Sequence, residues 1–304
     1  MTEVRRGSDW ARFRRGATPW IFLLPWLIGA TVFTIGPTLL GLVMSFTNWN
    51  LRFPTQWVGL DNYAEMLTDD YRFWLSLRIT GFYLLISVPL YLVVGLTTAL
   101  LLNARVWGIR FFRTILFMPS VLSGVAVAIL WLLLLNPDRG AINTVLRSIG
   151  VENPPGWFQD PAWAVQALVI TGLWGVLGNG AIIYLAGLQN ISPTMYEAAM
   201  IDGAGSWRRF RSVTLPLLTP RLFFMLLTSI IGAFQVFDTA FTIGRGRGGD
   251  SLRFYLIYLW EAGFRDGRLG YAAALSMVLF LIGTLVVIVL LRTQDRWVHY
   301  QDEE

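Results

Sequence analysis

Long apolar runs, separated by shorter polar segments, make up most of the chain. Six charge-poor runs each reach the roughly 20 residues that a helix needs to cross about 30 Å of hydrocarbon. These runs lie at residues 20–46, 79–104, 114–135, 163–188, 222–243 and 269–291. A helix satisfies its backbone hydrogen bonds internally, as lipid requires. The pattern therefore predicts an all-α integral membrane protein with six transmembrane helices.

The distribution of arginine predicts how these helices are oriented. Six spans place both termini, residues 1–19 and 293–304, on the same side of the membrane. Fourteen of the 24 basic residues, all of them Arg, fall in segments on the side of the N-terminus, and five of these lie in residues 1–19. Because Arg is retained on the cytoplasmic side during insertion, we expect both termini to be cytoplasmic. The longer outer connections carry Trp residues, which would either lie at the membrane interface as a belt or stack on a ligand.

A polar segment at residues 197–220 lies between the fourth and fifth runs, on the predicted cytoplasmic side. Ser192 followed by Pro193 predicts a helix start, because a Ser side chain caps the first amides and Pro fits the first turn. Gly203 or Gly205 is expected to end this short helix, since glycine tolerates a left-handed backbone.

A second short helix is expected directly after that turn. Ser206 is placed to cap it, and three arginines give it a basic face: Arg208, Arg209 and Arg211. Pro216 and Pro220 are expected to disturb this helix before the next apolar run. The whole segment is thus predicted to be helix, glycine turn and helix.

Composition excludes several kinds of chemistry. The 304 residues are 55% hydrophobic and 14% charged, with no Cys, no Lys and a single His, which is His299 in the polar C-terminal tail. Without Lys there is no Walker A lysine, and without Cys and with one His there is no thiol nucleophile or Cys/His metal cluster. We therefore expect a non-catalytic chain that binds no metal and no cofactor.

The polar segment resembles the EAA loop of binding-protein-dependent ABC importer permeases. The resemblance rests on Glu197, Ala198, Ala199, Asp202, Gly203, Ala204, Phe210, Leu215 and Pro216. It extends over most of residues 60–292, where the stretches 136–143, 237–238 and 269–274 are similar to the first permease of maltose and glycerol-phosphate importers. Residues 244–250 depart from that pattern, since they replace a common Gly-Gly-Pro with an Arg- and Gly-rich sequence.

This resemblance implies a permease subunit in a bacterial-type plasma (inner) membrane. Its implied partners are a second homologous permease, a dimer of ATPase subunits that uses ATP and Mg, an external solute-binding protein and the lipid bilayer, with no nucleic acid. Residues 189–220 would form the coupling loop. Glu197 would supply a charge to the ATPase, Ala198 and Ala199 would allow close packing, and Gly203 would make the turn. The arginines suit an ATPase or anionic headgroups equally.

Small and polar residues at helical spacing are candidates for a substrate path through the bundle. In the fourth run Gly172, Gly175, Val176 and Asn179 share one face; in the fifth, Gly232, Ala233 and Val236 do so, with Gln235 and Asp238 on a neighbouring face. The helices concerned line the sugar site in maltose-type permeases. Glycine also serves close helix packing, and amides bond neighbouring helices.

A carboxylate within a span is costly, which makes Asp238 a candidate functional residue. Substrate contact and pairing with an outer-loop Arg both remain open for this side chain. The leading hypothesis is half of a translocation path for a carbohydrate, a related polyol or a sugar phosphate. An ion-coupled secondary carrier is the alternative, although such carriers usually have several intramembrane ionisable groups.

Overall fold

The computed structural model describes residues 20, 22–104, 108–244 and 249–299. Within these residues the chain is helical, and the sole β-type pairing is an isolated bridge between Thr47 and Trp57. The all-α prediction is therefore confirmed. The chain divides into two compact units: Met1–Glu65 with Ala262–Val278, and Met66–Glu261 with Leu279–Glu304.

The first unit contains a helix near the N-terminus and the beginning of α14 (Leu269–Thr293). The N-terminal helix runs from Phe22 to Met44 and includes the π-helical turn η1 (Thr31–Ile35) before α2 (Gly36–Met44). A helix with this length and apolar composition is long enough to cross a bilayer. The first predicted span is thus present as one helix.

The turn after α2 is held by buried polar contacts within the first unit. Asn62, in α3 (Asp61–Thr68), donates from Nδ2 to the carbonyls of Ser45 and Thr47 at 2.8 and 2.9 Å. The backbone amide of Gly270 donates to the carbonyl of Trp49 at 2.9 Å. A Cβ at position 270 would overlap the carbonyl oxygen of Thr47, so only glycine fits this close approach.

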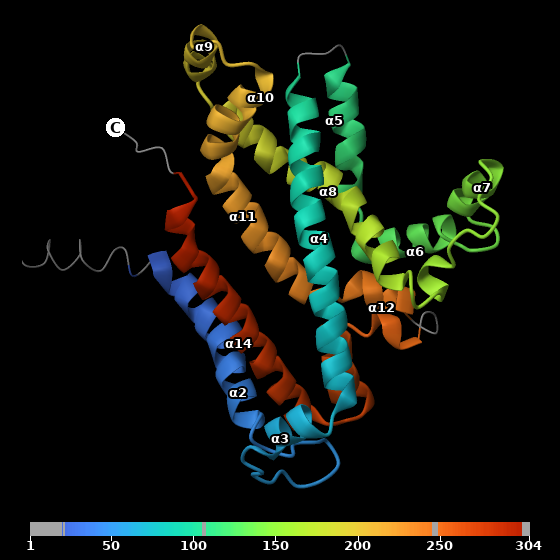
Figure 1. Ribbon diagram of the computed structural model, residues 1–304. Helices are drawn as coiled ribbons and strands as arrows, with labels where there is room; N and C mark the ends of the chain where they lie inside the picture. The colour runs from blue at the N-terminus through green and yellow to red at the C-terminus, as the bar shows by residue number, and fades with distance from the viewer. Residues whose placement is uncertain (1–19, 21, 105–107, 245–248, 300–304) are drawn as a thin grey trace, which may run out of the picture. The chain divides into compact units, whose positions relative to one another are not determined.

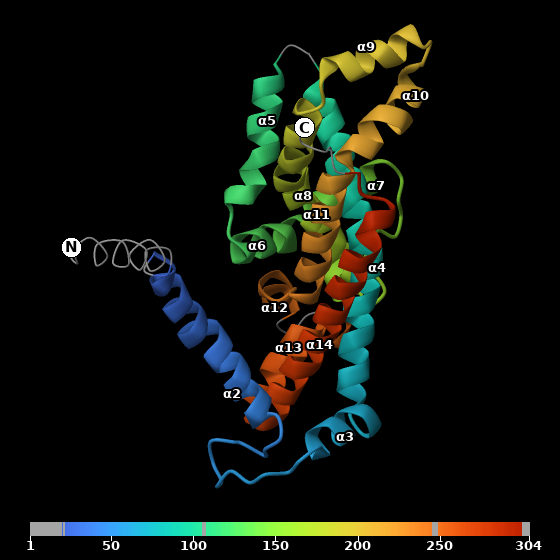
Figure 2. The same cartoon turned by 90° about the vertical axis from the view of Figure 1, so that its left-hand side faces the viewer.

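The second unit is built around α4 (Tyr71–Asn103) and α8 (Ala164–Gln189), which pack extensively on each other (Figures 1 and 2). The helix α11 (Leu215–Phe234) also packs on both. The helix α4 begins eight residues before the predicted span at residues 79–104. Asp70 caps α4 earlier, because its carboxylate accepts from the backbone amides of Arg72 and Phe73.

The third predicted span, residues 114–135, is not one helix. It consists of α5 (Ile109–Phe117), the 3₁₀ turn η2 (Met118–Val121) and α6 (Gly124–Leu134), with a bend of 107° between the two helical pieces. Pro119 opens the 3₁₀ turn, and Ser123 caps α6 by accepting from the amide of Ala126. A proline followed by an N-cap is a signal for a helix start, and here it overrides the continuous apolar pattern.

The fifth predicted span, residues 222–243, is also divided. The helix α11 ends at Phe234, and α12 (Asp238–Gly244) begins after a break at residues 235–237. The segment Ser206–Gly244 as a whole is still long and apolar enough to cross a membrane, and Asp238 lies near its end, just past the interruption. Its carboxylate lies in the first turn of α12, where the helix dipole favours negative charge.

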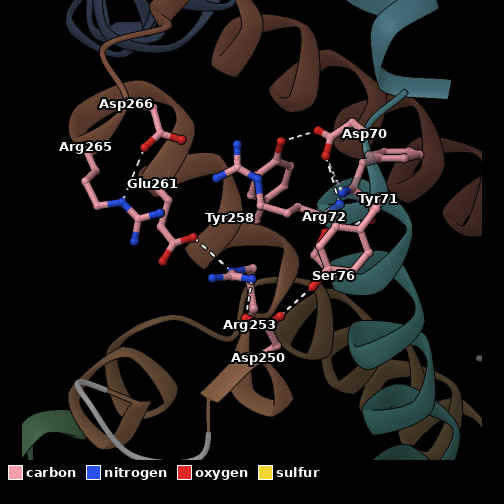
Figure 3. A network of polar contacts seen from close by, with 11 residues as sticks. Asp70, Tyr71, Arg72, Ser76, Asp250, Arg253, Tyr258, Glu261, Arg265 and Asp266 are labelled. Carbon is pink, nitrogen blue, oxygen red and sulfur yellow. Dashed lines mark hydrogen bonds and ion pairs between the residues drawn. The ribbon is translucent and has the colours of Figure 1, made fainter. Parts of the chain in front are cut away.

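A polar network fastens the segment after α12 to the start of α4 (Figure 3). The carboxylate of Asp70 accepts from the Tyr258 hydroxyl, and Asp250 accepts from the Tyr71 hydroxyl at 2.5 Å. Arg253 donates to Asp250 at 2.5 Å. These contacts join η5 (Gly249–Leu252) and α13 (Tyr255–Trp260) to α4. The network thereby holds the chain that follows α12.

The loop after α6 is ordered around one buried amide. Asn143, in α7 (Ala141–Ser148), is fully buried, donates to the carbonyls of Pro137 and Pro155, and accepts from the indole Nε1 of Trp157 at 2.6 Å. Trp157 is thus held by a hydrogen bond inside the protein and is itself buried. For this Trp, neither an interfacial belt nor ligand stacking describes its position.

Candidate functional site

The predicted cytoplasmic helix is present as α9 (Pro193–Ile201). The Ser192 hydroxyl caps its first turn, and Pro193 occupies the first helical position, as predicted. Gly203 has φ of 75°, and the amide of Ala204 donates to the carbonyl of Ala199 at 2.9 Å, which closes a glycine-terminated helix end. The prediction that a glycine ends this helix is confirmed for Gly203, whereas Gly205 has an ordinary backbone with φ of −66°.

The second helix differs from its prediction in two respects. Gly205 is the N-cap of α10 (Ser206–Arg209), so Ser206 is the first helical residue and not the cap. The prolines do not interrupt the helix, because the chain stays helical through the π turn η4 (Phe210–Thr214) into α11. The wider turn places the amide of Leu215 on the carbonyl of Phe210 immediately before Pro216.

The second proline is tolerated through a side-chain substitute for the missing amide. Pro220 has no N–H to give to the carbonyl of Pro216, four residues earlier. The hydroxyl of Thr219 donates to that carbonyl at 2.6 Å instead. The helix therefore passes both prolines without leaving a backbone acceptor unpaired at Pro216.

The α9 helix presents an exposed surface that mixes charge with apolar side chains. Glu197 and Ala198 are exposed, Ile201 is 87% exposed, and Trp207 on α10 is 73% exposed. On the opposite face, the Tyr196 hydroxyl lies 3.1 Å from the Thr214 hydroxyl, and this contact ties α9 to η4. A helix that packs on the protein through one face and exposes apolar side chains on the other is suited to bind another protein.

The structure divides the eight predicted coupling residues into two groups. Glu197, Ala198, Asp202 and Gly203 lie on the exposed side of α9 and its turn; Ala199, Phe210, Leu215 and Pro216 are partly buried beneath them. Phe210 stacks on Trp207 with ring centroids 5.5 Å apart. The first group is available to a partner, and the second supports it.

A second feature is a cavity of about 330 Å³ within the second unit. Its walls come from α4, η2, α6, α8 and the break between α11 and α12. The lining residues are Tyr83, Pro119, Gly124, Val127, Leu168, Thr171, Gly172, Trp174, Gly175, Gln235, Val236, Phe237, Asp238 and Thr239. The two breaks that interrupt the third and fifth runs thus both contribute to one cavity.

Five of the nine predicted path residues meet at this cavity, namely Gly172, Gly175, Gln235, Val236 and Asp238. The other four do not line it. Val176 points to Gly95 and Gly180, Ala233 is buried in the core, and Asn179 and Gly232 are exposed elsewhere. The break after Phe234 ends the helical register, so the face shared by Gly232, Ala233 and Val236 in a continuous helix does not persist.

Sequence reasoning missed the aromatic part of the cavity. Thr171 precedes Gly175 by four residues and so lies on the same face of α8, which means that helical spacing alone was able to find it. Tyr83, Trp174 and Phe237 belong to apolar runs and carry no such signal. Their position depends on the packing of α4 against α8 and on the break after α11.

One cavity wall depends on a close approach between α4 and α8. The hydroxyls of Tyr83 and Tyr91 lie 3.0 Å apart, and Tyr91 donates to the carbonyl of Val169 at 3.2 Å. A Cβ at Gly172 would overlap the Tyr91 hydroxyl. Gly172 thus serves both close packing and the cavity wall. By contrast, a Cβ at Gly175 would meet nothing within 4 Å.

Asp238 is exposed and is the only charged residue among the described residues that line the cavity. Its side chain lies beside Gly124, and the neighbouring Thr239 hydroxyl is 3.5 Å from the Gly124 carbonyl. Among the residues that the structure describes, no arginine forms an ion pair with Asp238. Arg245 and Arg247, which follow α12 in the sequence, lie outside the described residues. The described residues also contain no group of three His, Asp or Glu able to hold a metal ion.

A helical chain with several apolar helices long enough to cross a membrane, a cavity and a short exposed helix between two of the long helices has the construction of a transporter's membrane subunit. Residues 91–300 match the family described as binding-protein-dependent transport system inner membrane component, and the chain belongs to this family. Its function class is therefore that of a permease subunit of an ABC importer.

The chain is similar to three curated permeases over nearly its whole length. It is 39% identical to the probable ABC transporter permease protein YesP of Bacillus subtilis, over 93% of this chain and 92% of the relative. Identity is 36% to the lactose transport system permease protein LacF of Rhizobium radiobacter, covering 86% and 89% of the two chains. It is 32% to the sn-glycerol-3-phosphate transport system permease protein UgpA of Shigella flexneri, covering 95% and 98%.

The fold is also that of a solved transporter chain. A chain in the crystal structure of a bacterial ABC transporter involved in the import of the acidic polysaccharide alginate superimposes with a TM-score of 0.83. The superposition covers 95% of this chain and 99% of that chain, at 24% sequence identity. This likeness confirms the predicted importer-permease fold.

Proposed function

We propose that this chain forms half of the translocation path for a neutral carbohydrate or polyol. The observation that carries this proposal is the cavity, whose walls combine aromatic rings with hydrogen-bonding side chains. Tyr83, Trp174 and Phe237 offer flat apolar surfaces for the C–H face of a sugar ring, while Thr171 and Gln235 offer polar groups for its hydroxyls. Relatives named for lactose and for trehalose and maltose support a carbohydrate ligand.

The sign of the cavity charge favours a neutral ligand over a phosphate ester. Asp238 is negative, and among the described residues none that lines the cavity is positive. A phosphate or carboxylate close to Asp238 would be repelled by its negative charge. The second permease would complete the path and contribute the facing wall.

Transport energy would enter through α9. The exposed surface of Glu197, Ala198 and Ile201 supports docking on an ATPase subunit, with ATP and Mg bound by that partner. Both termini and α9 would then face the cytoplasm, and an external solute-binding protein would deliver the ligand to the opposite side. A short docked helix moves as one body, which suits the transmission of a conformational change.

Reconstitution of the chain with its co-purifying subunits tests this proposal. Uptake should require ATP, and Asp238→Asn should change ligand selectivity while leaving the amount of assembled complex unchanged. Ala198→Trp should leave assembly of the two permeases intact but abolish docking on the ATPase, because a large side chain replaces a small one on the exposed surface. Uptake by this chain alone, without ATP, would instead identify an ion-coupled carrier.

A further inference from the structure

A separate apolar groove lies on the second unit, away from the cavity described above. It has a volume of about 530 Å³ and lies between α5 and α8, next to the end of α4. The lining residues are Leu102, Arg113, Thr114, Leu116, Phe117, Met118, Val121, Leu177, Gly178, Ile182 and Leu185. Figure 1 shows α5 standing beside α4 and α8 at this position. The volume is within the range of about 300–1,000 Å³ that is typical of small-molecule sites.

The groove forms because α5 contacts α8 closely at one point and diverges from it elsewhere. A Cβ at Gly178 would lie 3.2 Å from the Cα of Phe117, so this glycine lets the two helices meet. Beyond this point the chain bends by 107° into α6. The side chains of Met118 and Val121 are left 65% and 81% exposed at the far end of the groove.

One end of this apolar groove carries a fixed positive charge. Arg113 is the only charged residue among the described residues that line the groove, and its Nη2 donates to the carbonyl of Leu102 at 2.9 Å. The Nε of Arg113 is buried and has no hydrogen-bond acceptor. In the described part of the chain, no carboxylate pairs with Arg113. An arginine without a counter-ion at the edge of an apolar membrane helix is costly.

We propose that this groove binds one anionic phospholipid, with an acyl chain along α5 and α8 and the phosphate at Arg113. A phosphodiester supplies the acceptors and the negative charge that Arg113 lacks. Arg110 precedes Arg113 by three residues on α5 and is exposed, so two positive charges lie near the same end. This pair favours phosphatidylglycerol over phosphatidylcholine, whose choline group is itself positive. The inference does not depend on the proposed carbohydrate path.

Native mass spectrometry of the full-length chain with its co-purifying subunits tests the proposal. The complex is exposed to an equal mixture of phosphatidylglycerol and phosphatidylcholine and then freed of loosely held lipid. We expect one retained phosphatidylglycerol, with a preference of about tenfold, as one charge-assisted contact supplies. Arg113→Gln should remove the preference, whereas Arg292→Gln, in the last turn of α14, should leave it unchanged.

A second variant keeps the charge and removes the space. Ile182→Trp fills the groove and should abolish retention of the lipid, while Ile129→Trp, an exposed position on α6 outside the groove, should not. Equal retention of both lipids, or equal effects of the two Arg variants, would overturn the proposal. So would a complex that retains no lipid while the isolated chain retains one, because the second permease would then cover the groove.

Discussion

Replacing Gly172 by alanine should damage the chain far more than the same change at Gly175, one helical turn later. The added methyl group at position 172 would overlap the Tyr91 hydroxyl, and the ring carbon Cζ of Tyr91 lies 2.8 Å from the same point. Overpacking of this kind costs about 1–3 kcal/mol. Tyr91 must then shift, which weakens its contacts with Tyr83 and Val169 at about 0.5–1.5 kcal/mol each.

These contributions predict a loss of about 2–6 kcal/mol for Gly172→Ala. Gly175→Ala meets open space, and alanine is the better helix former, so its stability should be unchanged or slightly higher. The assay is thermal unfolding of the purified protein in a mild detergent, followed by the loss of monodisperse material. The two variants share one helix and one cavity, which makes them a matched pair.

Tyr91→Phe in the Gly172→Ala background provides the decisive control. Removing the hydroxyl relieves the worst overlap, so the double variant should be more stable than Gly172→Ala alone. Rescue should be partial, because the ring carbon remains close to the new methyl group. Equal stability of the two single alanine variants, or no rescue in the double variant, would refute this account of the packing between α4 and α8.

Three further changes test other parts of the structure. Gly203→Val forces a branched side chain into a backbone with φ of 75°, at a cost of about 1–2 kcal/mol, and should uncouple ATP hydrolysis from uptake in the reconstituted complex without lowering the yield of folded chain. Thr219→Val removes the hydroxyl that serves Pro216, so the melting temperature should fall, whereas Thr219→Ser should preserve it. Gly270→Ala should reduce the yield of monodisperse protein, because its methyl group overlaps the Thr47 carbonyl, while Gly283→Ala in the same helix meets nothing within 4 Å and serves as the control.

The positions of the spans were predictable where apolar pattern and helix signals agree. The runs at 163–188 and 269–291 match α8 and α14 within two residues at each end. The 114–135 and 222–243 runs are equally apolar, yet each is broken, because membrane helices tolerate a break that lines a cavity. Pro119 and Ser123 carried a readable signal for the first break, but nothing in residues 235–237 marks the second.

The same distinction applies to the candidate site. The turn at Gly203 followed from local chemistry, since glycine alone suits a left-handed residue at a helix end. Helical spacing brought Gly172 and Gly175 to the cavity because α8 is continuous there. It failed for Gly232 and Ala233, since the same spacing rule assumes a helix that does not end at Phe234. The Tyr83 hydroxyl depends on a tertiary contact with Tyr91, which no local pattern encodes.

The helical path from Ser206 through Phe234 is unbroken, so it connects the α10 region to the cavity as one rod within the second unit. At 1.5 Å per residue, its 29 residues measure about 43 Å, nearly the thickness of a bilayer with its headgroups. One end bears the exposed Trp207, and the other stops at Gln235 on the cavity wall. A tilt of about 10° at the first end would displace the second by about 7 Å, given this length. The π turn at Phe210–Thr214 lies next to the Trp207 end of this rod, so a bend at this irregular turn would leave Leu215–Phe234 to move as one lever arm.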